Sequence, residues 1–557
     1  MRSILPRVGA SSGRRSFTAA LLAVVVAAGL AACSGTATKN TASSTVSLDE
    51  SVVSVADGSL RGSSADGYRA FLGVPYAAPP VAALRWKPPA PAVKWSGQRD
   101  ATKAGAACPQ GTSLVSGGDS GNGSNVEDCL FLNVYTPTAG TARRTLTEDA
   151  SKGKLPVMVW IHGGSYINGA GSDYGPGRLV TESGVIVVTI NYRLGALGFM
   201  DLPQLESETS LGSGTYGLLD QQAALRWVQK NIAKFGGDAK NVTIFGESAG
   251  AGSVCSQLVS PQAKGLFAKA IAESGCALRG PTKATAEKTG IALAAQLGCK
   301  GATIVACMRS KPAATIRSTQ NSSGTTLAWA PANGGPVLPT TVEAAFASGN
   351  YSTVPLLQGT NHDEGRLFAL SLGLNNLGTD LYSYAVNRAA PSAAAKILAE
   401  YPLAKYDNKP GDALGAIITD NTFSCPALRV DQSASKRTSV YGYEFNDPKA
   451  PLPLVASYPL KAAHAAELPY LFDLKKLGAL PSTAQKLSQQ MIGYWTNFAI
   501  SGDPNGSGNP PWAKFAGSSG NLQALLPGGS QTLASTSFAA DHHCGFWNTL
   551  PNLSLRS

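Results

Sequence analysis

Charged residues and histidines are scarce in this chain of 557 residues. Only 15% of its residues are charged, and the formal net charge is +11. Four of those charges belong to arginines in the first 32 residues, and the other basic residues are scattered, with no basic run interleaved with aromatics. Because a nucleic-acid surface needs such a run, we expect no nucleic-acid partner and interpret the charge as a solvated surface.

Long apolar runs are equally rare. One Ala- and Val-rich stretch, from Phe17 to Ala32, follows a basic segment that ends in Arg14-Arg15. This pattern predicts an export signal over residues 1–32, and the arginine pair is also compatible with a twin-arginine signal. A membrane span needs ~20 apolar residues, which neither this run nor any later one supplies. We therefore expect the body of the protein to be soluble.

Cys33 follows the apolar stretch directly. Residues 30–34 read Leu-Ala-Ala-Cys-Ser, which resembles the bacterial lipoprotein box, in which the cysteine thiol takes a diacylglycerol and becomes the new N-terminus. An ordinary secretory signal with an incidental cysteine is the alternative. We expect residues 33–50 to be a Ser- and Thr-rich tether, and the protein to lie on the outer face of the cell membrane as a lipoprotein or to be secreted.

The other eight cysteines are an even number in a chain expected to be exported, where disulfides form and persist. No CxxC motif or paired His/Cys cluster is present, so we expect no metal site. Spacing suggests three disulfides and leaves two cysteines as candidates for a fourth: Cys108 with Cys129, Cys299 with Cys307, Cys425 with Cys544, and Cys255 with Cys276.

Strand-like and helix-like segments alternate along the remaining chain. The helical spacing of Leu225, Val228, Ile232 and Phe235 predicts a helix. We expect it to be closed by Gly236-Gly237-Asp238. Alternation of this kind predicts an α/β fold with a largely parallel sheet, formed by residues 51–557 as one domain. The expected strands are the β-branched runs Val157–Ile161, Val185–Ile190, Val242–Phe245, Val354–Gln358 and Val440–Phe445.

The strongest local motif is Gly246-Glu247-Ser248-Ala249-Gly250. It follows the apolar run that ends at Phe245 and precedes a helix start rich in small residues. This context is typical of a nucleophile elbow, a tight strand-to-helix turn that exposes a serine hydroxyl at a helix N-terminus. The motif predicts Ser248 as a nucleophile, with the backbone N–H of Ala249 as a donor to the oxyanion.

A serine hydroxyl needs an adjacent base, usually histidine, and this chain has only five. His162 lies in an upstream glycine turn, His362 lies two residues before a candidate acid, and His542 and His543 lie near the C-terminus. His464 remains. It follows the serine and the acid, as the order serine, acid, histidine requires.

The third member of such a triad is an acid at the carboxyl end of a strand. The apolar run from Val354 leads into the turn Asp363-Glu364-Gly365, from which a carboxylate can reach the far ring nitrogen of His464 and fix its tautomer. Asp363 and Glu364 are indistinguishable on this chemistry alone.

A second glycine-rich turn follows the run that ends at Ile161. It reads His162-Gly163-Gly164-Ser165, and glycine lets backbone N–H groups approach a substrate closely. We predict Gly164 and Ser165 as further oxyanion donors; a plain glycine turn is the alternative.

Together these motifs resemble the carboxylesterase type B family, the branch of the α/β-hydrolase fold that contains the cholinesterases. The resemblance extends from about Val52 to Pro551. It includes Phe71-Leu-Gly-Val-Pro-Tyr-Ala, Glu127-Asp-Cys-Leu-Phe-Leu-Asn-Val-Tyr-Thr-Pro, Asn191-Tyr-Arg-Leu-Gly, Trp495-Thr-Asn-Phe-Ala and Gly502-Asp-Pro-Asn.

The resemblance implies a large, mostly parallel central sheet flanked by helices. It selects Glu364 as the acid, supports His464 as the base, and supports the first three disulfide pairings. Two departures stand out. Cys255 and Cys276 lie outside the family's usual bridges, and Ser165 stands where many members have a third oxyanion-hole glycine.

The predicted reaction is hydrolysis of a small-molecule ester through a covalent acyl-enzyme, without a metal or organic cofactor. An amidase, thioesterase or lipase with the same triad is an alternative, as is a non-catalytic binding module of this fold. A cholinesterase is disfavoured, because the loop from Cys108 to Cys129 contains no aromatic residue for a cation–π site.

Overall fold

The computed structural model describes residues 51–65, 67–112, 119–138, 153–320, 327–452, 454, 456–550 and 553. The expected export signal, the lipidation site at Cys33 and the expected tether lie outside these residues.

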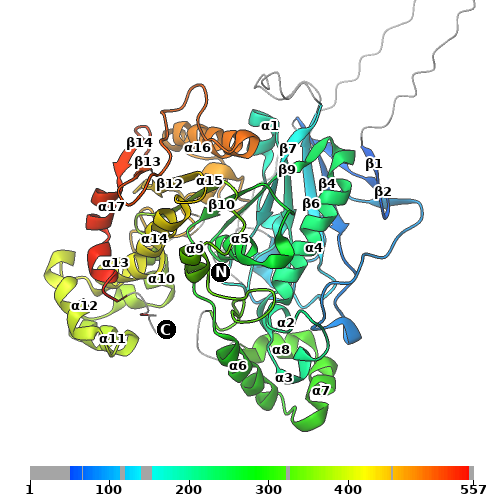
Figure 1. The fold of residues 1–557 in the computed structure, drawn as a ribbon, viewed down its shortest axis with the longest axis horizontal. Coiled ribbons are helices and arrows are strands. Elements are labelled where there is room, and N and C mark those ends of the chain that lie inside the picture. Colours follow the sequence, from blue (N-terminus) through cyan, green and yellow to red (C-terminus); the bar gives the residue numbers. More distant parts are fainter. Residues whose placement is uncertain are drawn as a thin grey trace, which may run out of the picture. The chain divides into compact units, whose positions relative to one another are not determined.

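One large sheet of eleven strands runs through the described domain, and a smaller sheet joins β1 (Val52–Val55), β2 (Gly58–Arg61) and β5 (Gln98–Asp100) (Figure 1). Neighbouring strands from β13 to β8 pair in parallel, whereas β14, β6, β4 and β3 pair antiparallel at the two edges. In spatial order the large sheet contains β14 (Gln531–Ala534), β13 (Asn521–Leu525), β12 (Val440–Phe445), β11 (Leu356–Asn361), β10 (Lys269–Glu273), β9 (Gly237–Glu247), β7 (Leu155–Ile161), β8 (Ile186–Ile190), β6 (Phe131–Pro137), β4 (Tyr68–Pro75) and β3 (Ser63–Ala65).

The predicted α/β class with a mostly parallel sheet is confirmed. The five β-branched runs singled out in the sequence overlap β7, β8, β9, β11 and β12; the runs predicted from Val185 and Val354 begin one and two residues before β8 and β11. These strands read as continuous apolar runs because a parallel sheet covered on both faces buries every side chain.

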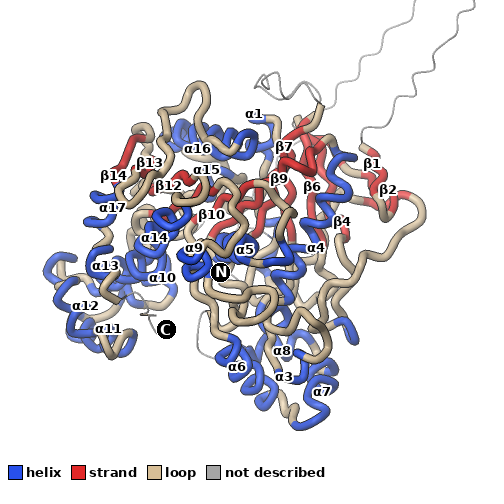
Figure 2. Tube along the Cα trace, in the orientation of Figure 1, coloured by secondary structure: helices blue, strands red, loops and turns tan. Residues whose placement is uncertain are grey.

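Strand β7 shows how the two faces are built. Val157, Val159 and Ile161 belong to one hydrophobic cluster, together with residues of α4 (Tyr216–Asn231) and α5 (Ala249–Val259). Met158 and Trp160 belong to a second cluster, with α1 (Gly177–Ser183) and α16 (Ser482–Ser501). Since successive side chains of a strand point to opposite faces, the sheet separates two cores, and Figure 2 shows helices on both sides of the strands.

The predicted helix around Leu225 is α4, which continues into a 3₁₀ turn, Ile232–Phe235. Gly236 ends this turn with φ 88°, a left-handed conformation that favours glycine. Gly237 and Asp238, which we expected to close the helix as well, instead begin β9. Gly236 alone therefore ends the helical segment, and Gly237 is the first residue of the next strand.

Most other helices are short, and the sequence patterns did not single them out. Within the described ranges, no single helix is long and apolar enough to cross a membrane; the pair Lys283–Gln296 and Gly301–Ser310, bent by 103°, meets that criterion by length and composition alone. The remaining α-helices are α2 (Gly195–Phe199), α3 (Pro203–Glu206), α6 (Lys283–Gln296), α7 (Ile304–Ser310), α8 (Ala313–Gln320), α9 (Val342–Ser348), α10 (Gly365–Ser371), α11 (Tyr382–Ala389), α12 (Ala394–Glu400), α13 (Pro410–Ile418), α14 (Cys425–Ala434), α15 (Leu468–Leu471), α17 (Ser535–Asp541) and α18 (Cys544–Trp547).

Four disulfides cross-link the domain. One of them joins α5, the helix after Ser248, to the segment that follows β10, and another joins α14 to α18 near the C-terminus. The bonded pairs are Cys108–Cys129, Cys255–Cys276, Cys299–Cys307 and Cys425–Cys544.

Candidate active site

Ser248 occupies the turn between β9 and α5. Its backbone has φ 56° and ψ −123°, a conformation that residues other than glycine rarely adopt. The turn lies against the end of β7, so closely that a β-carbon at Gly250 would overlap the carbonyl oxygen of Ile161. The N–H of Ser248 donates to the carbonyl of Glu273 at 2.9 Å, which holds the turn on β10. The flanking glycine is thus required by close backbone approach.

His464 and Glu364 lie in line with Ser248. His464 Nε2 is 2.8 Å from Ser248 Oγ, and His464 Nδ1 is 2.6 Å from Glu364 Oε2. The other oxygen of Glu364 accepts the backbone N–H of Asn361 at 2.8 Å. Both partners of the serine are buried, with 5% of His464 and 0% of Glu364 exposed. The structure therefore brings together three residues that are far apart in the sequence.

The two candidate acids of the Asp363-Glu364 turn face different histidines. Glu364 contacts His464, whereas Asp363 Oδ2 lies 3.1 Å from Nδ1 of His362. Geometry separates the two carboxylates where residue chemistry alone did not.

Burial and charge act in opposite directions on His464. Burial lowers the pKa of the imidazole, but the negative charges of Glu247 and Glu364 outweigh that effect, so the pKa lies above its ordinary value. Glu247 Oε1 is 3.2 Å from His464 Nε2. Burial raises the pKa of Glu247, the negative charge of Glu364 raises it further, and the positive charge of His464 lowers it.

Two more buried carboxyl groups surround this site, and the sequence analysis did not identify them. Glu273, on β10, accepts a hydrogen bond from Trp495 Nε1 at 2.9 Å, and burial raises its pKa to about 8. Glu467 accepts a hydrogen bond from the Asn361 side chain, and burial raises its pKa well above the ordinary value. Neither residue belongs to a local motif around Ser248, so the sequence offered no reason to select them. Glu467 follows His464 by three residues, which was the one available signal.

Two aromatic rings cover the imidazole of His464. The ring centroids of Phe368 and Phe423 lie 5.0 Å and 4.9 Å from the imidazole centroid. Phe368 lies on α10, which starts directly after Glu364, and Phe423 lies in a π-helical turn, Thr419–Ser424. Neither ring belongs to a motif, so only the structure reveals that they limit solvent access to the base.

The second glycine turn lies beside the serine. A β-carbon at Gly163 would lie 3.1 Å from Ser248 Cβ, and Gly164 and Ser165 both have positive φ, 102° and 55°. No described residue accepts a hydrogen bond from the backbone N–H groups of Gly164, Ser165 and Ala249. These N–H groups are therefore available to an incoming group.

His162, in the same turn, is fully buried and stacks on Tyr192 with ring centroids 4.4 Å apart. Burial lowers its pKa to about 4, so the imidazole is neutral at physiological pH. The Tyr192 hydroxyl donates to the carbonyl of His162 at 2.9 Å. These contacts indicate a structural role for His162.

A mostly parallel sheet covered by helices on both faces, with a serine at a strand-to-helix turn and a histidine and an acid in line with it, defines an α/β-hydrolase. The model of the family described as the carboxylesterase family matches residues 49–547. The chain therefore belongs to the carboxylesterase family.

Individual relatives agree with this assignment. The chain is 38% identical over 477 residues to para-nitrobenzyl esterase of Bacillus subtilis (strain 168), covering 82% of this chain and 91% of that protein. It is 36% identical over 476 residues to acylcarnitine hydrolase of Mus musculus, covering 80% and 81% of the two chains. A solved structure of PNB esterase superposes with a TM-score of 0.75 at 32% identity, covering 89% of this chain and 99% of that one. The protein is an enzyme of the carboxylesterase class.

Proposed function

We propose that this protein is a serine carboxylesterase that hydrolyses small-molecule esters through a covalent acyl-enzyme. Ser248 is the nucleophile, His464 the general base and Glu364 the acid that orients the base. The observation that carries the proposal is the continuous line of contacts at 2.8 Å and 2.6 Å from Ser248 Oγ through His464 to Glu364.

In the first half of the reaction, Ser248 Oγ attacks the ester carbonyl while His464 Nε2 takes the hydroxyl proton. Glu364 stabilises the imidazolium that forms. The negative charge that develops on the carbonyl oxygen is bound by the backbone N–H groups of Gly164, Ser165 and Ala249. His464 then gives its proton to the departing alcohol, which leaves the acyl group on Ser248.

In the second half, water attacks the acyl-enzyme while His464 takes a proton from it. The second tetrahedral species uses the same N–H groups, and His464 returns the proton to Ser248 Oγ as the acid product leaves. Because one imidazole carries every proton, this scheme requires no metal or organic cofactor.

Esters are the preferred substrate class among the acyl compounds that these catalytic residues could accept. The relatives named above are a para-nitrobenzyl esterase and an acylcarnitine hydrolase, and both names describe release of an alcohol from an ester. Matched ester, thioester and amide substrates with the same acyl group test this choice, and we expect the ester to have the largest kcat/KM.

We also propose that residues 51–557 form the catalytic domain of an exported protein, with residues 1–32 as signal and Cys33 as the lipidated residue. Four disulfides support an oxidising compartment. Cys33→Ser is expected to move the esterase from the membrane fraction to the soluble fraction, and equal membrane recovery of variant and wild type would contradict the anchor.

Hydrolysis of p-nitrophenyl esters, from acetate to palmitate, tests the catalytic proposal. Ser248→Ala is expected to lower kcat by about 10⁴-fold or more, while Ser371→Ala, at an exposed position on α10, keeps the wild-type rate. Equal rates for Ser248→Ala and wild type would overturn the proposal, and a folded but inert wild type would favour a binding module.

A further inference from the structure

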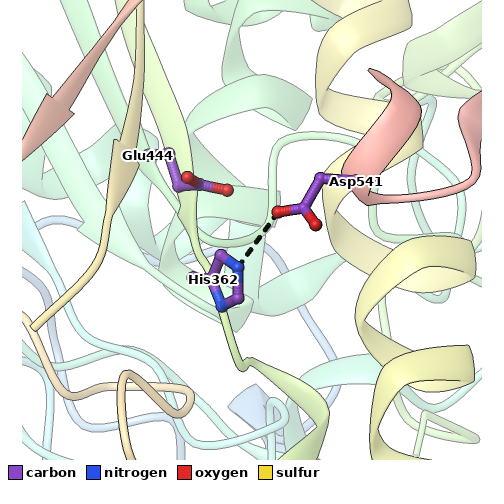
Figure 3. A group of neighbouring side chains, drawn as sticks. All are labelled: His362, Glu444 and Asp541. Atoms are coloured by element: carbon purple, nitrogen blue, oxygen red, sulfur yellow. Dashed lines mark hydrogen bonds and ion pairs between the residues drawn. The ribbon is translucent and has the colours of Figure 1, made fainter. Parts of the chain in front are cut away.

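A second group of titratable side chains lies outside the proposed catalytic site (Figure 3). His362 comes from the turn after β11, Glu444 from β12 and Asp541 from the last residue of α17. One nitrogen or oxygen atom from each lies within 4.8 Å of the others, and His362 Nε2 is 3.1 Å from Asp541 Oδ2. Because these three segments are distant in the chain, no local motif signals the group.

We propose that His362, Glu444 and Asp541 bind a divalent transition-metal ion of the zinc type. One imidazole nitrogen and two carboxylate oxygens form a donor set that Zn²⁺ accepts, at about 2.0–2.2 Å from each ligand atom. Tetrahedral ligands at that range lie ~3.3–3.5 Å apart, close to the separation between His362 and Asp541. Asp541 is exposed, with a side-chain exposure of 61%, so water can reach the ion and complete its coordination.

The surrounding contacts orient two of the three ligands. His362 Nδ1 lies 3.1 Å from Asp363 Oδ2, which leaves Nε2 directed toward Asp541. Glu444 Oε1 is 2.8 Å from His542 Nε2, and no described residue hydrogen-bonds the second oxygen of Glu444. Metal-binding histidines and carboxylates in proteins are held by such outer hydrogen bonds.

His542 is itself held in place on its other side. Its Nδ1 lies 2.7 Å from Asp420 Oδ1, and both residues are 3% exposed. Glu444 is therefore positioned by a buried chain of contacts rather than by solvent. These buried hydrogen bonds distinguish the group from acidic side chains that lie close together on the surface by chance.

The charge balance also favours a cation. Four carboxylates, Asp363, Asp420, Glu444 and Asp541, contact the imidazoles of His362 and His542. Lys461, whose Nζ is 3.7 Å from Asp363 Oδ1, supplies one further positive charge. Arg366 also acts electrostatically on Asp363. Because His362 must be unprotonated at Nε2 to bind a metal ion, the four carboxylates then exceed the positive charges of His542, Lys461 and Arg366, and a bound divalent ion offsets the difference.

Such an ion would connect α17 to the turn that carries Glu364, because His362 is separated from Glu364 by a single residue. Its expected effect is to hold that turn and α17 together. Bound to the folded state alone, it raises the melting temperature as its concentration rises above Kd.

Equilibrium dialysis of the purified full-length protein, stripped of metal with a chelator, against Zn²⁺ tests the site. We expect one Zn²⁺ per chain at this site and a higher melting temperature. Asp541→Asn, which keeps the size of an exposed side chain, is expected to weaken binding at least tenfold. Asp407→Asn, at a side chain 85% exposed, is the matched control and is expected to bind as the wild type does. Mg²⁺ at the same concentration is expected to bind far more weakly, because it prefers oxygen ligands.

A second variant separates this site from adventitious binding at His464. His362→Gln is expected to lose the same Zn²⁺ as Asp541→Asn, and a far-UV circular dichroism spectrum like that of wild type reports that each variant is folded. Absence of Zn²⁺ binding by wild type at millimolar concentration would overturn the proposal. Binding to Asp541→Asn and His362→Gln as tight as to wild type, or Mg²⁺ binding as tight as Zn²⁺ binding, would overturn it too.

Discussion

Two buried histidines, His464 and His542, have carboxylate neighbours but different second partners. His464 has Glu364 at Nδ1 and the Ser248 hydroxyl at Nε2; Glu247 Oε1 lies farther from Nε2, at 3.2 Å, and makes no hydrogen bond within the described residues. His542 has a carboxylate at each nitrogen, Asp420 and Glu444, at 2.7 Å and 2.8 Å. An imidazole hydrogen-bonded to a carboxylate at each nitrogen holds two protons and cannot act as a base, whereas one hydrogen-bonded to a hydroxyl has a nitrogen available to take its proton.

Neighbouring carboxylates raise the pKa of both histidines, so the hydrogen-bond partners and not the direction of the pKa shift separate their roles. Burial lowers the pKa of His542, but hydrogen bonds and charges from Asp420 and Glu444 raise it to about 9 overall, so it is a cation at neutral pH. The comparison indicates that the partner on the second nitrogen decides whether a buried histidine serves chemistry or structure. Exchanging or removing these partners tests that conclusion.

The largest expected effect comes from removing the proposed base. His464→Ala is expected to lower kcat by about 10⁴- to 10⁶-fold, because it removes the group hydrogen-bonded to the Ser248 hydroxyl. His542→Ala, normalised to folded protein, is expected to keep most of its activity. Steady-state hydrolysis of p-nitrophenyl acetate measures both, and equal losses in the two variants would remove the distinction between the histidines.

The next effect separates the neighbouring acids. Glu364→Gln is expected to lower kcat by ~10³- to 10⁴-fold, because the amide no longer fixes the tautomer of His464 or stabilises its charge. Asp363→Asn, whose parent carboxylate faces His362, is expected to lower kcat less than about tenfold. A greater loss in Asp363→Asn than in Glu364→Gln would reverse the assignment of the acid.

Stability is expected to respond to the other histidine. His542→Ala leaves Asp420 and Glu444 buried without their cation, a change that typically costs about 3–5 kcal/mol of unfolding free energy. Urea denaturation measures the loss. His542→Gln, which can still hydrogen-bond but carries no charge, is expected to be intermediate, and a variant as stable as wild type would show that the ion pair is not structural.

The smallest effect is a pH dependence of that stabilisation. The pKa of His542 is raised from the unfolded value of about 6.5 to about 9, so its stabilising charge is fully present below pH 6.5 and is lost as pH rises through 9. The stability difference between metal-free wild type and His542→Gln should therefore be larger at pH 6 than at pH 9.5. A difference that grows with pH would contradict the sign of the shift.

The sequence predicted those features of the fold and the site that are encoded by residues close together in the chain. Continuous apolar runs identified β7, β8, β9, β11 and β12, because strands buried on both faces are apolar at nearly every position and do not alternate with polar residues. The motif around Ser248 is local. Elimination among five histidines suggested His464, and the family resemblance supported that choice.

Long-range features required the structure. Residue chemistry alone left Asp363 and Glu364 equivalent; the family resemblance selected Glu364, and only the structure shows which histidine each carboxylate faces. Glu273, Phe368 and Phe423 reach the site from separate elements, and the group of His362, Glu444 and Asp541 forms only when β11, β12 and α17 come together. Contacts between residues so distant in the chain produce no recognisable pattern in the sequence.

Covalent labelling with a fluorophosphonate most directly tests whether Ser248, activated by His464, is the catalytic nucleophile. The probe forms a stable phosphonyl ester only with an activated serine, and peptide mass spectrometry locates it. We expect one adduct per chain on Ser248, formed in step with loss of esterase activity and greatly slowed in His464→Ala. Complete inactivation with the adduct on another residue, or equal labelling rates in wild type and His464→Ala, would contradict the account.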